Sequence, residues 1–383
     1  MITLLERIFI KQGKDERRAY GILCGTLGIA LNLLLFAGKY LAGFLSGSIA
    51  VMADAFNNLS DAGSSVITLL GFQFAGQAAD EEHPFGHGRI EYLSGLAVSI
   101  AIIVMGVELG RSSIEKIIHP EAVDIGVLSM AILLASVAVK LYMSFYNRRI
   151  GAKIDSAAMK ATATDSLSDA LATSMVLISM LIMKFTGVNV DGWCGVLVAV
   201  FILKAGYEAA KETLNPLLGQ APEPEFIEEI QNIVLSRPEI IGIHDLVVHD
   251  YGPGHRMVSL HGEVDGSQDI FELHDAIDGV EMELQERLGC QAVIHMDPVN
   301  LKDPEMKEKK AMVEQIVKAV DSRLTIHDFR LVHGGGVTKL LFDVVMPFEM
   351  KMGEEELKKQ VQDQVCETMP CCCAIIQIDH SYV

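Results

Sequence analysis

The sequence predicts a membrane protein with two parts: an all-α domain of six transmembrane helices, followed by small α+β domains outside the membrane. Half of the 383 residues are hydrophobic and only 21% are charged, and the mean hydropathy is positive at +0.32. The net charge is −19, and residues 214–383 contribute −17 of it, with 14 Lys and Arg against 31 Asp and Glu. This profile excludes an intrinsically disordered chain and argues against a nucleic-acid binder.

Six apolar stretches are long enough to cross a bilayer, which requires about 20 helical residues. They run over residues 21–45, 49–74, 92–110, 125–146, 157–185 and 188–203. Lys and Arg cluster before the first stretch and in every second loop after it, so the positive-inside rule places both termini in the cytoplasm. We therefore predict a multi-pass protein of the cell membrane, with a cytoplasmic arm at 1–20 and a transmembrane domain at 21–213. The alternative, a soluble protein with buried helices, is disfavoured by the number of such stretches.

Polar residues interrupt two of these spans at a regular spacing. Asn57 and Asp61 lie four residues apart in the second span, and Asp165 and Asp169 lie four apart in the fifth. This spacing places each pair on one helix face. Four oxygen ligands suit Mn²⁺, Mg²⁺ or Ca²⁺ better than tetrahedral Zn²⁺. The alternative is that these side chains only hydrogen-bond between helices.

Three further charged residues lie inside predicted spans, namely Lys39, Glu108 and Lys140. We interpret them as interfacial or snorkelling side chains, because a long side chain can carry its charge to the membrane surface.

Several motifs together resemble the cation diffusion facilitator family. They are NNLSDAGSS in the second span, DEEHPFGHGRIEYLSGL in the loop that follows, and DSLSDALATS in the fifth span. The likeness covers about residues 15–300. It implies a homodimeric transporter that exchanges cytoplasmic divalent metal for protons, and it assigns the transport site to Asn57, Asp61, Asp165 and Asp169. Zinc-transporting members commonly have His where this chain has Asp165, so the set resembles the manganese-exporting branch.

The resemblance implies a second metal site in the loop, at Asp80, His83 and His87. The alternative is a loop whose histidines cap helix ends or stack on each other. A hydrolytic metal centre built on the same three residues is a further alternative. It would need an additional ligand, a general base and a substrate cleft, and the sequence has no nucleophile motif to accompany them.

The tail after the sixth span begins with a proline-rich linker that breaks the helix. The pattern then predicts a helix at 225–236, strands at 244–249 and 256–264, a helix at 270–288 and a strand at 291–297. This order is half of a ferredoxin-like fold, which we assign to a cytoplasmic domain at 214–300.

The tail then repeats, because Ile-His-Asp-Leu at 243–246 recurs as Ile-His-Asp-Phe at 326–329, an offset of 83. We predict a second ferredoxin-like copy at 301–383. The resemblance places tail metal ligands at His244, His261, His274, His295 and Asp297, where a metal can join two protomers. The alternative is a solvated histidine cluster without metal.

The offset of 83 puts Leu357 and Ile378 opposite His274 and His295. We therefore expect the second copy to lack a metal site. The run Cys371, Cys372 and Cys373 can bind soft metals or respond to oxidation, but we expect buried structural cysteines.

These observations predict a secondary active transporter and not an enzyme. We expect a homodimeric Mn²⁺/H⁺ antiporter that moves metal out of the cytoplasm by alternating access. One alternative is an exporter of Zn²⁺, Fe²⁺, Co²⁺ or Cd²⁺ built on the same site. An alternative of another class is a membrane-anchored metal sensor, in which the tail signals and the spans serve only as an anchor.

Overall fold

The computed structural model describes residues 16–46, 49–119, 127–186, 188, 190–334 and 337–380. The predicted cytoplasmic arm at 1–20 lies outside the described residues up to position 15. The chain divides into two compact units. One comprises Met1–Gln220 with Asp250–His255, and the other comprises Ala221–His249 with Arg256–Val383.

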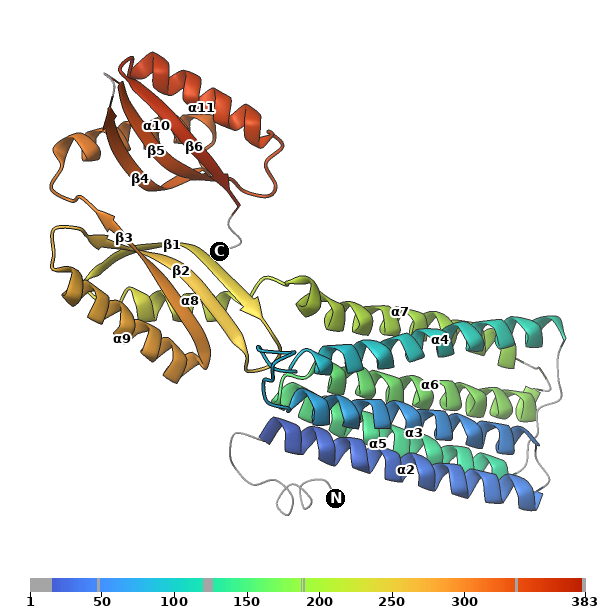
Figure 1. Ribbon diagram of the computed structural model, residues 1–383. Helices are drawn as coiled ribbons and strands as arrows, with labels where there is room; N and C mark the ends of the chain where they lie inside the picture. Colours follow the sequence, from blue (N-terminus) through green and yellow to red (C-terminus); the bar gives the residue numbers. More distant parts are fainter. Residues whose placement is uncertain are drawn as a thin grey trace. The chain divides into compact units, whose positions relative to one another are not determined.

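The first unit is a bundle of long helices that run side by side (Figure 1). The described helices of this bundle are α2 (Glu16–Ser46), α3 (Ile49–Ala75), α4 (Ile90–Ile118), α5 (Val127–Lys153), α6 (Ala157–Thr186) and α7 (Asp191–Leu218). All of them except α3 contain a described stretch long and apolar enough to cross a membrane. In α3, several side chains near the N-terminal end lie outside what the structure describes.

Two helices are longer than the predicted spans. Helix α4 continues beyond residue 110 to Ile118, and α7 continues beyond residue 203 to Leu218. The extensions contain charged residues that hydropathy treats as span ends, although Glu, Lys and Arg favour helix. Helix α7 ends at Gly219, which adopts a left-handed conformation with φ 86°.

Close approaches between the helices require glycine at particular positions. A Cβ atom added at Gly95 of α4 would lie 2.9 Å from the Ala158 Cα atom of α6. One added at Gly25 of α2 would lie 3.1 Å from the Leu69 Cα atom of α3. Small residues at helix contacts are typical of membrane bundles, where dispersion and hydrogen bonds hold the helices together.

A buried carboxylate connects several helices at one end of the bundle. Glu91 of α4 is buried, and its two carboxylate oxygens accept hydrogen bonds from the Arg17 guanidinium of α2 at 2.8 and 3.0 Å. The Ser156 hydroxyl, which precedes α6, also donates to Glu91. Arg17 reaches further to the backbone carbonyl of Asp155 at 2.9 Å. This network fixes α2, α4 and the α5–α6 connection to one another.

The second unit contains two modules with the same order of elements, helix, strand, strand, helix, strand. The first module, residues 224–299, consists of α8 (Pro224–Val234), β1 (Ile240–Asp250), β2 (Arg256–Asp265), α9 (Ile270–Leu288) and β3 (Cys290–Val299). The second module, residues 304–379, consists of α10 (Pro304–Val320), β4 (Thr325–Gly334), β5 (Val337–Val345), α11 (Glu354–Thr368) and β6 (Cys372–Asp379).

Each module has one three-stranded sheet, in the order β1-β2-β3 or β4-β5-β6. Strands β2 and β3 are parallel, as are β5 and β6, while β4 and β5 are antiparallel. The helices cover one face of each sheet, and the other face carries no helix of its own module (Figure 1). Each module encloses its own apolar core, which contains Leu260 and Val280 in the first and Leu340 and Val361 in the second.

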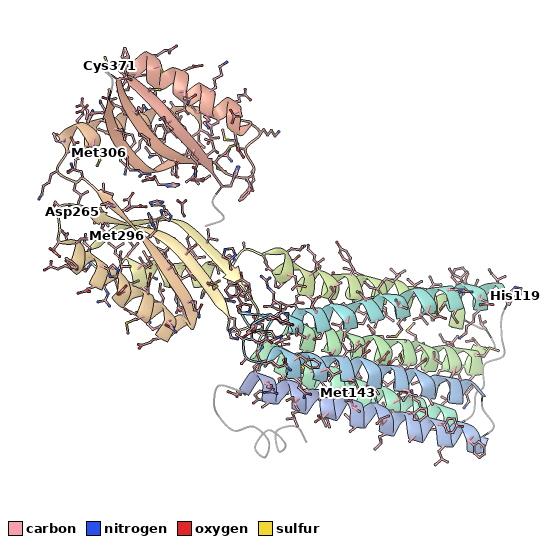
Figure 2. The ribbon with its side chains drawn as sticks, viewed as in Figure 1. His119, Met143, Asp265, Met296, Met306 and Cys371 are labelled. Carbon is pink, nitrogen blue, oxygen red and sulfur yellow. The ribbon has the colours of Figure 1, made fainter. Side chains whose placement is uncertain are left out.

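Aspartate side chains cap the N-terminal ends of two of these helices. The Asp269 carboxylate accepts from the Phe271 backbone N–H ahead of α9, and Asp303 accepts from the Glu305 and Met306 N–H groups ahead of α10. Such caps satisfy N–H groups that the first helical turn leaves unpaired. Figure 2 labels Met306 at the start of α10 and Met296 on β3, and both pack against the core of their own module.

Candidate metal centres

The four residues predicted as the transport site lie on α3 and α6. Asp61 of α3 and Asp165 of α6 are buried, at 8% and 4% exposure. Asp169 lies one turn after Asp165, and its side chain is 13% exposed. Asn57, one turn before Asp61, is exposed. The structure therefore places three of the four predicted ligands in the bundle interior and leaves the Asn57 side chain outside it.

A lysine lies between two of these carboxylates. Lys140 of α5 is buried, and its Nζ donates to Asp61 Oδ2 at 2.6 Å and to Asp169 Oδ2 at 2.7 Å. The interpretation of Lys140 as a snorkelling side chain is therefore wrong. Lys39 is also buried, whereas Glu108 is exposed. A hydropathy profile shows only that a charged residue interrupts an apolar span. It does not show whether the helix face that carries this residue meets a carboxylate.

The three carboxylates do not form a compact ligand cluster by themselves. In the described part of the chain, every group of three or more His, Cys, Asp or Glu ligand atoms within 4.8 Å of one another lies outside the helical spans. Asp61 and Asp169 meet through the ammonium group instead. A buried ammonium group with two carboxylate partners shows where this bundle can hold positive charge.

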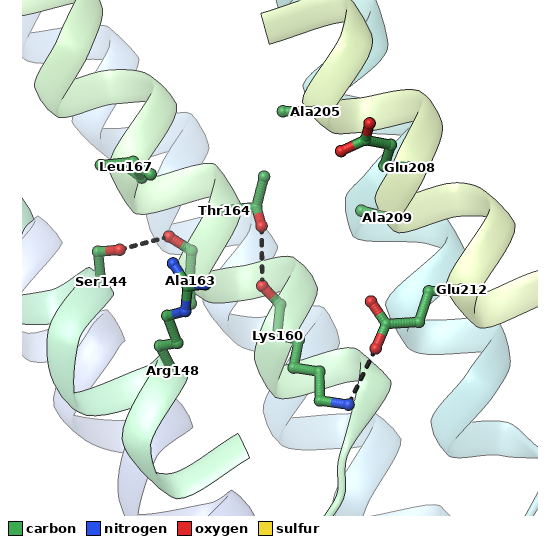
Figure 3. Close-up of a pocket in the computed structure, with 10 residues that line it drawn as sticks. All are labelled: Ser144, Arg148, Lys160, Ala163, Thr164, Leu167, Ala205, Glu208, Ala209 and Glu212. Carbon is green, nitrogen blue, oxygen red and sulfur yellow. Dashed lines mark hydrogen bonds and ion pairs between the residues drawn. The ribbon is translucent and has the colours of Figure 1, made fainter. Parts of the chain in front are cut away.

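A cavity of about 280 Å³ lies among α5, α6 and α7 (Figure 3). Lys160 of α6 and Glu212 of α7 form an ion pair at 2.9 Å on its wall. Its wall on α6 includes Ala163, Thr164 and Leu167, which flank Asp165 in the sequence. The other lining residues are Ser144, Arg148, Ala205, Glu208 and Ala209. The cavity is thus lined by charged as well as apolar side chains, including two glutamates of α7.

The loop between α3 and α4 brings its three predicted ligands together. Asp80 lies 3.5 Å from His83 Nδ1 and 3.6 Å from His87 Nε2. The two imidazole rings are 4.5 Å apart. The backbone N–H of His83 donates to Asp80 at 2.7 Å, and this bond holds the pKa of the Asp80 carboxyl below its ordinary value. An ionised carboxylate with two imidazoles in this arrangement is suited to bind a divalent cation.

Four of the five predicted tail ligands meet on the first module. Asp297 of β3 lies 2.8 Å from His261 Nδ1, 3.2 Å from His244 Nε2 and 3.4 Å from His295 Nε2. Parallel pairing places His261 of β2 directly beside His295 of β3. The pairing of β2 with β3 thus brings His261, His295 and Asp297 to neighbouring positions.

The fifth predicted tail ligand, His274, lies apart. It is on α9, where its side chain is 66% exposed and forms a pair with Asp278 at 3.4 Å. Within one chain, His274 is therefore separate from the other four predicted tail ligands, and its role as a ligand stays a prediction. Helix α9 covers the face of the sheet opposite to the histidines, so the separation follows from the two-layer arrangement of the module.

Two ligand clusters include residues that the sequence did not predict. One contains His244, Asp245 and His327, and the other contains Asp245, His327, Asp343 and Asp379. We expected the second module to lack a metal site, yet three of its side chains, His327, Asp343 and Asp379, lie close enough together with Asp245 to be metal ligands. Burial and the neighbouring Asp379 carboxylate raise the pKa of Asp343.

The repeat alignment missed Asp343 and Asp379 because the offset between the two modules is not constant. It is 83 from His244 to His327 but 82 in the later strands, where His261 pairs with His295 and Asp343 pairs with Gln377. A shift of one residue in the repeat alignment was the missed signal.

The three consecutive cysteines alternate along the last strand. Cys372 is buried, whereas Cys371 and Cys373 are exposed. The expectation of buried structural cysteines is therefore wrong for two of the three. Successive side chains of a strand point to opposite faces of the sheet, which is why Cys372 and Cys373 differ in burial. Cys371 lies just before the first residue of β6 (Figure 2).

Comparison with known sequences gives two family matches. Residues 25–218 match the family described as cation efflux transmembrane domain. Residues 222–299 match the family described as cation efflux protein, cytoplasmic domain. Neither match extends into the second module.

Several relatives have a similar sequence over nearly their whole length. An uncharacterized transporter of Methanocaldococcus jannaschii is 32% identical over 279 residues, which are 72% of this chain and 97% of the relative. A protein named cation-efflux pump FieF from Escherichia fergusonii is 29% identical over 289 residues, 74% of this chain and 96% of the relative. A protein of the same name from Klebsiella pneumoniae is 27% identical over 285 residues, 73% of this chain and 95% of the relative.

Proposed function

The chain belongs to the cation efflux family of multi-pass membrane transporters, the cation diffusion facilitators, and from this premise we propose that it exports Mn²⁺ from the cytoplasm in exchange for protons. Its substrate ion binds to Asp61, Asp165 and Asp169, with Asn57 as a fourth ligand in a conformation that turns α3 inward. All four supply oxygen, which suits Mn²⁺ better than Zn²⁺.

The observation that carries this proposal is the position of Lys140. Its ammonium group lies 2.6 Å from Asp61 Oδ2 and 2.7 Å from Asp169 Oδ2 inside the bundle. Both carboxylates thus already bind a cation, tethered to the protein itself. A divalent ion that binds the same oxygens displaces this ammonium group, and release of the metal allows it to return.

The charge of the site fits an exchange of cations. Three carboxylates and one ammonium group give a formal charge of −2, which a dication or two protons neutralise. A bound dication disfavours protonation of its ligands, so metal and protons compete for the same oxygens. Uptake of one therefore promotes release of the other, as antiport requires.

The cavity beside α6 supports a path to this site. It carries Glu208 and Glu212 on α7, and its wall includes the neighbours of Asp165 (Figure 3). Carboxylates at such an entrance attract cations and repel anions. The acidic tail adds to this effect if both termini lie in the cytoplasm, as we propose for a protein of the cell membrane with six spans.

We further propose that the tail contains two ferredoxin-like copies and that the protein functions as a homodimer. The shared order of elements and the recurring Ile-His-Asp sequence support the duplication. The matched cytoplasmic family covers only the first copy. The loop set Asp80, His83 and His87 and the first-module histidines are proposed as accessory metal sites.

Metal uptake into inside-out vesicles tests the transport function. Purified protein is reconstituted, and uptake of Mn²⁺ and of Zn²⁺ is measured under an imposed proton gradient. We expect saturable Mn²⁺ uptake that is lost in Asp165→Ala and shifts toward Zn²⁺ in Asp165→His. The control Glu108→Gln removes an exposed carboxylate from α4 and should leave uptake unchanged.

Each other outcome selects a different function. Preferential uptake of Zn²⁺, Fe²⁺, Co²⁺ or Cd²⁺ by the wild type would overturn the assignment of Mn²⁺ and leave the exporter. Proton-independent uptake would overturn the antiport. A folded protein that binds metal through its tail but carries none across the membrane would be a sensor.

A further inference from the structure

The two modules of the tail present the same kind of ligand at equivalent points. The motif His-Asp occurs at His244 and Asp245 in β1 and at His327 and Asp328 in β4. Both aspartates adopt a left-handed backbone conformation, with φ 51° at Asp245 and 49° at Asp328. Such a conformation is uncommon for a residue other than glycine and is found at bulges, where it redirects neighbouring side chains.

These two strands lie close to each other across the junction of the modules. The rings of His244 and His327 are 4.7 Å apart. The faces of the two sheets that carry no helix are turned toward each other, and α8, α9, α10 and α11 lie on the outer sides (Figure 1). Polar ligands from both modules therefore meet between the sheets.

We propose that a divalent metal ion binds at this junction, held by Asp245 of the first module and by His327, Asp343 and Asp379 of the second, and fastens the two modules together. The four ligand atoms lie within 4.8 Å of one another. His327 Nε2 is 3.5 Å from Asp379 Oδ2 and 3.8 Å from Asp245 Oδ1.

These separations fit a shared ion better than hydrogen bonds. A hydrogen bond between N–H and a carboxylate has a length of about 2.7–3.2 Å. Two ligands at about 2.1 Å from one metal ion lie about 3.0–3.4 Å apart in octahedral or tetrahedral geometry. A small inward movement of each side chain brings the cluster to that geometry.

Unpaired buried atoms give an independent indication of a missing ligand. Asp379 Oδ2, which lies 3.5 Å from His327 Nε2, is buried and forms no hydrogen bond within the described structure. In the adjacent first-module site, the His244 side chain is 6% exposed, and its Nε2, 3.2 Å from Asp297, likewise forms no hydrogen bond. Buried polar atoms normally have a partner, because leaving one unpaired is costly.

The charge of the cluster points to a cation. Three carboxylates gather there, and the ion pairs described for Asp245 and Asp379 are with histidines only. Like charges at this separation repel unless a cation or protons lie between them. One imidazole and three carboxylates form a mixed nitrogen and oxygen set that suits Mn²⁺, Fe²⁺, Co²⁺ or Zn²⁺.

The junction site adjoins the predicted first-module site without sharing its acidic ligand. The His244 ring contacts the rings of both His261, at 5.0 Å, and His327, at 4.7 Å. Its Nδ1 is directed to Asp245 and its Nε2 to Asp297. A continuous row of ligands therefore crosses from one module to the other. Metal binding there would make the relative position of the modules dependent on metal concentration.

Metal counting on the full-length protein in lipid nanodiscs tests this inference. Chelator-treated protein is dialysed against Mn²⁺ or Zn²⁺, and bound metal per chain is measured by mass spectrometry. We expect the double variant Asp343→Asn with Asp379→Asn to bind one ion fewer per chain than the wild type. The control Glu356→Gln with Asp363→Asn removes two carboxylates from α11 in the same module and should retain every ion.

Hydrogen exchange separates a clasp between modules from a site within one module. Metal should slow amide exchange in β4 and in the linker 300–303 of the wild type and the control. That protection should be lost in Asp343→Asn with Asp379→Asn and in Asp245→Asn. Metal-free exchange of α10 and α11 shows whether each variant is folded.

Equal metal content in the wild type and the folded double variant would overturn the proposal. Protection that survives Asp245→Asn would overturn the bridging role of the first module. Protection that depends on protein concentration would assign the ligands to two different chains and would overturn a clasp within one. None of these results depends on transport, so loss of the proposed export function would leave this inference standing or falling by itself.

Discussion

Replacing Lys140 with methionine tests how the bundle manages its internal charge. Methionine retains most of the volume of the lysine stem and removes the ammonium group. Asp61 and Asp169 would lose hydrogen bonds of 2.6 and 2.7 Å. Two opposite effects are expected under the proposed function, in which the ammonium group both stabilises the metal-free protein and competes with the metal ion.

The expected changes in folding stability and in Mn²⁺ affinity follow from the two hydrogen bonds that Lys140 donates. Removing one partner of a buried ion pair costs about 3–5 kcal/mol of folding stability. A hydrogen bond between charged groups contributes about 1.5–3 kcal/mol, and a metal ion that binds Asp61 and Asp169 must displace Lys140 from both. If the substitution spares the metal ion the free-energy cost of breaking one such hydrogen bond, Mn²⁺ binding becomes about 10- to 150-fold tighter, at about 1.4 kcal/mol per factor of ten.

The assay combines Mn²⁺ binding with thermal unfolding in nanodiscs. We expect Lys140→Met to unfold at a lower temperature than the wild type without metal and to gain more stability from Mn²⁺. Comparison with the double variant Lys140→Met with Asp169→Asn separates the stabilisation that comes from Mn²⁺ at the membrane site from the stabilisation that comes from Mn²⁺ at the tail. Lys184→Met, which removes an exposed lysine from α6, is the matched control.

Two results would refute this reasoning. Unchanged Mn²⁺ affinity in folded Lys140→Met would show that the ammonium group does not compete with the substrate. Full metal-free stability would show that the two carboxylates do not depend on it. Slower transport with tighter binding is the expected functional outcome, because the returning ammonium group no longer helps to expel the metal.

Three further predictions concern packing, acid stability and cysteine reactivity. Gly95→Ala should destabilise the bundle by about 1–3 kcal/mol, because its Cβ would lie 2.9 Å from the Ala158 Cα atom, whereas Gly38→Ala meets nothing within 4 Å and should not; thermal unfolding of both compares them. The Arg323 guanidinium lowers the pKa of Asp321 to about 2, so its contribution to stability is complete above about pH 4, the ordinary range of Asp, and is lost as the pH falls toward 2. Hydrogen exchange of α10 between these pH values should rise less in Asp321→Asn than in the wild type, and an equal rise would contradict the assignment. Maleimide should label Cys371 and Cys373 rapidly in the folded protein and Cys372 only after unfolding; labelling of Cys372 at the same rate would contradict the described strand.

The long helices illustrate what the sequence determines well. Spans of apolar residues are dictated by the thickness of the bilayer, and that constraint is local to each segment. The order of helices and strands in the first module likewise follows from local periodicity and from caps such as Asp269. The helix ends in α4 and α7 were predicted less well, because hydropathy stops at charged residues that a helix accommodates.

The tail ligands illustrate the limit of a repeat alignment. His244 and His327 are equivalent by an obvious motif, but Asp343 and Asp379 become equivalent to His261 and Asp297 only through strand pairing. A shift of one residue in a strand exchanges its two faces. The sequence therefore indicated the histidines and Asp297 of the first module, and only the strand pairing revealed Asp343 and Asp379 in the second.

By itself the sequence determined that this chain spans a membrane, that carboxylates at Asp61, Asp165 and Asp169 lie within the spans, and that the tail repeats a short motif. Each of these properties depends on residues close together in the chain. The tertiary structure decided that Lys140 lies between Asp61 and Asp169 and that ligands from two modules meet at Asp245 and His327. Such contacts join residues far apart in sequence, and only the packing of helices and sheets brings their charges together.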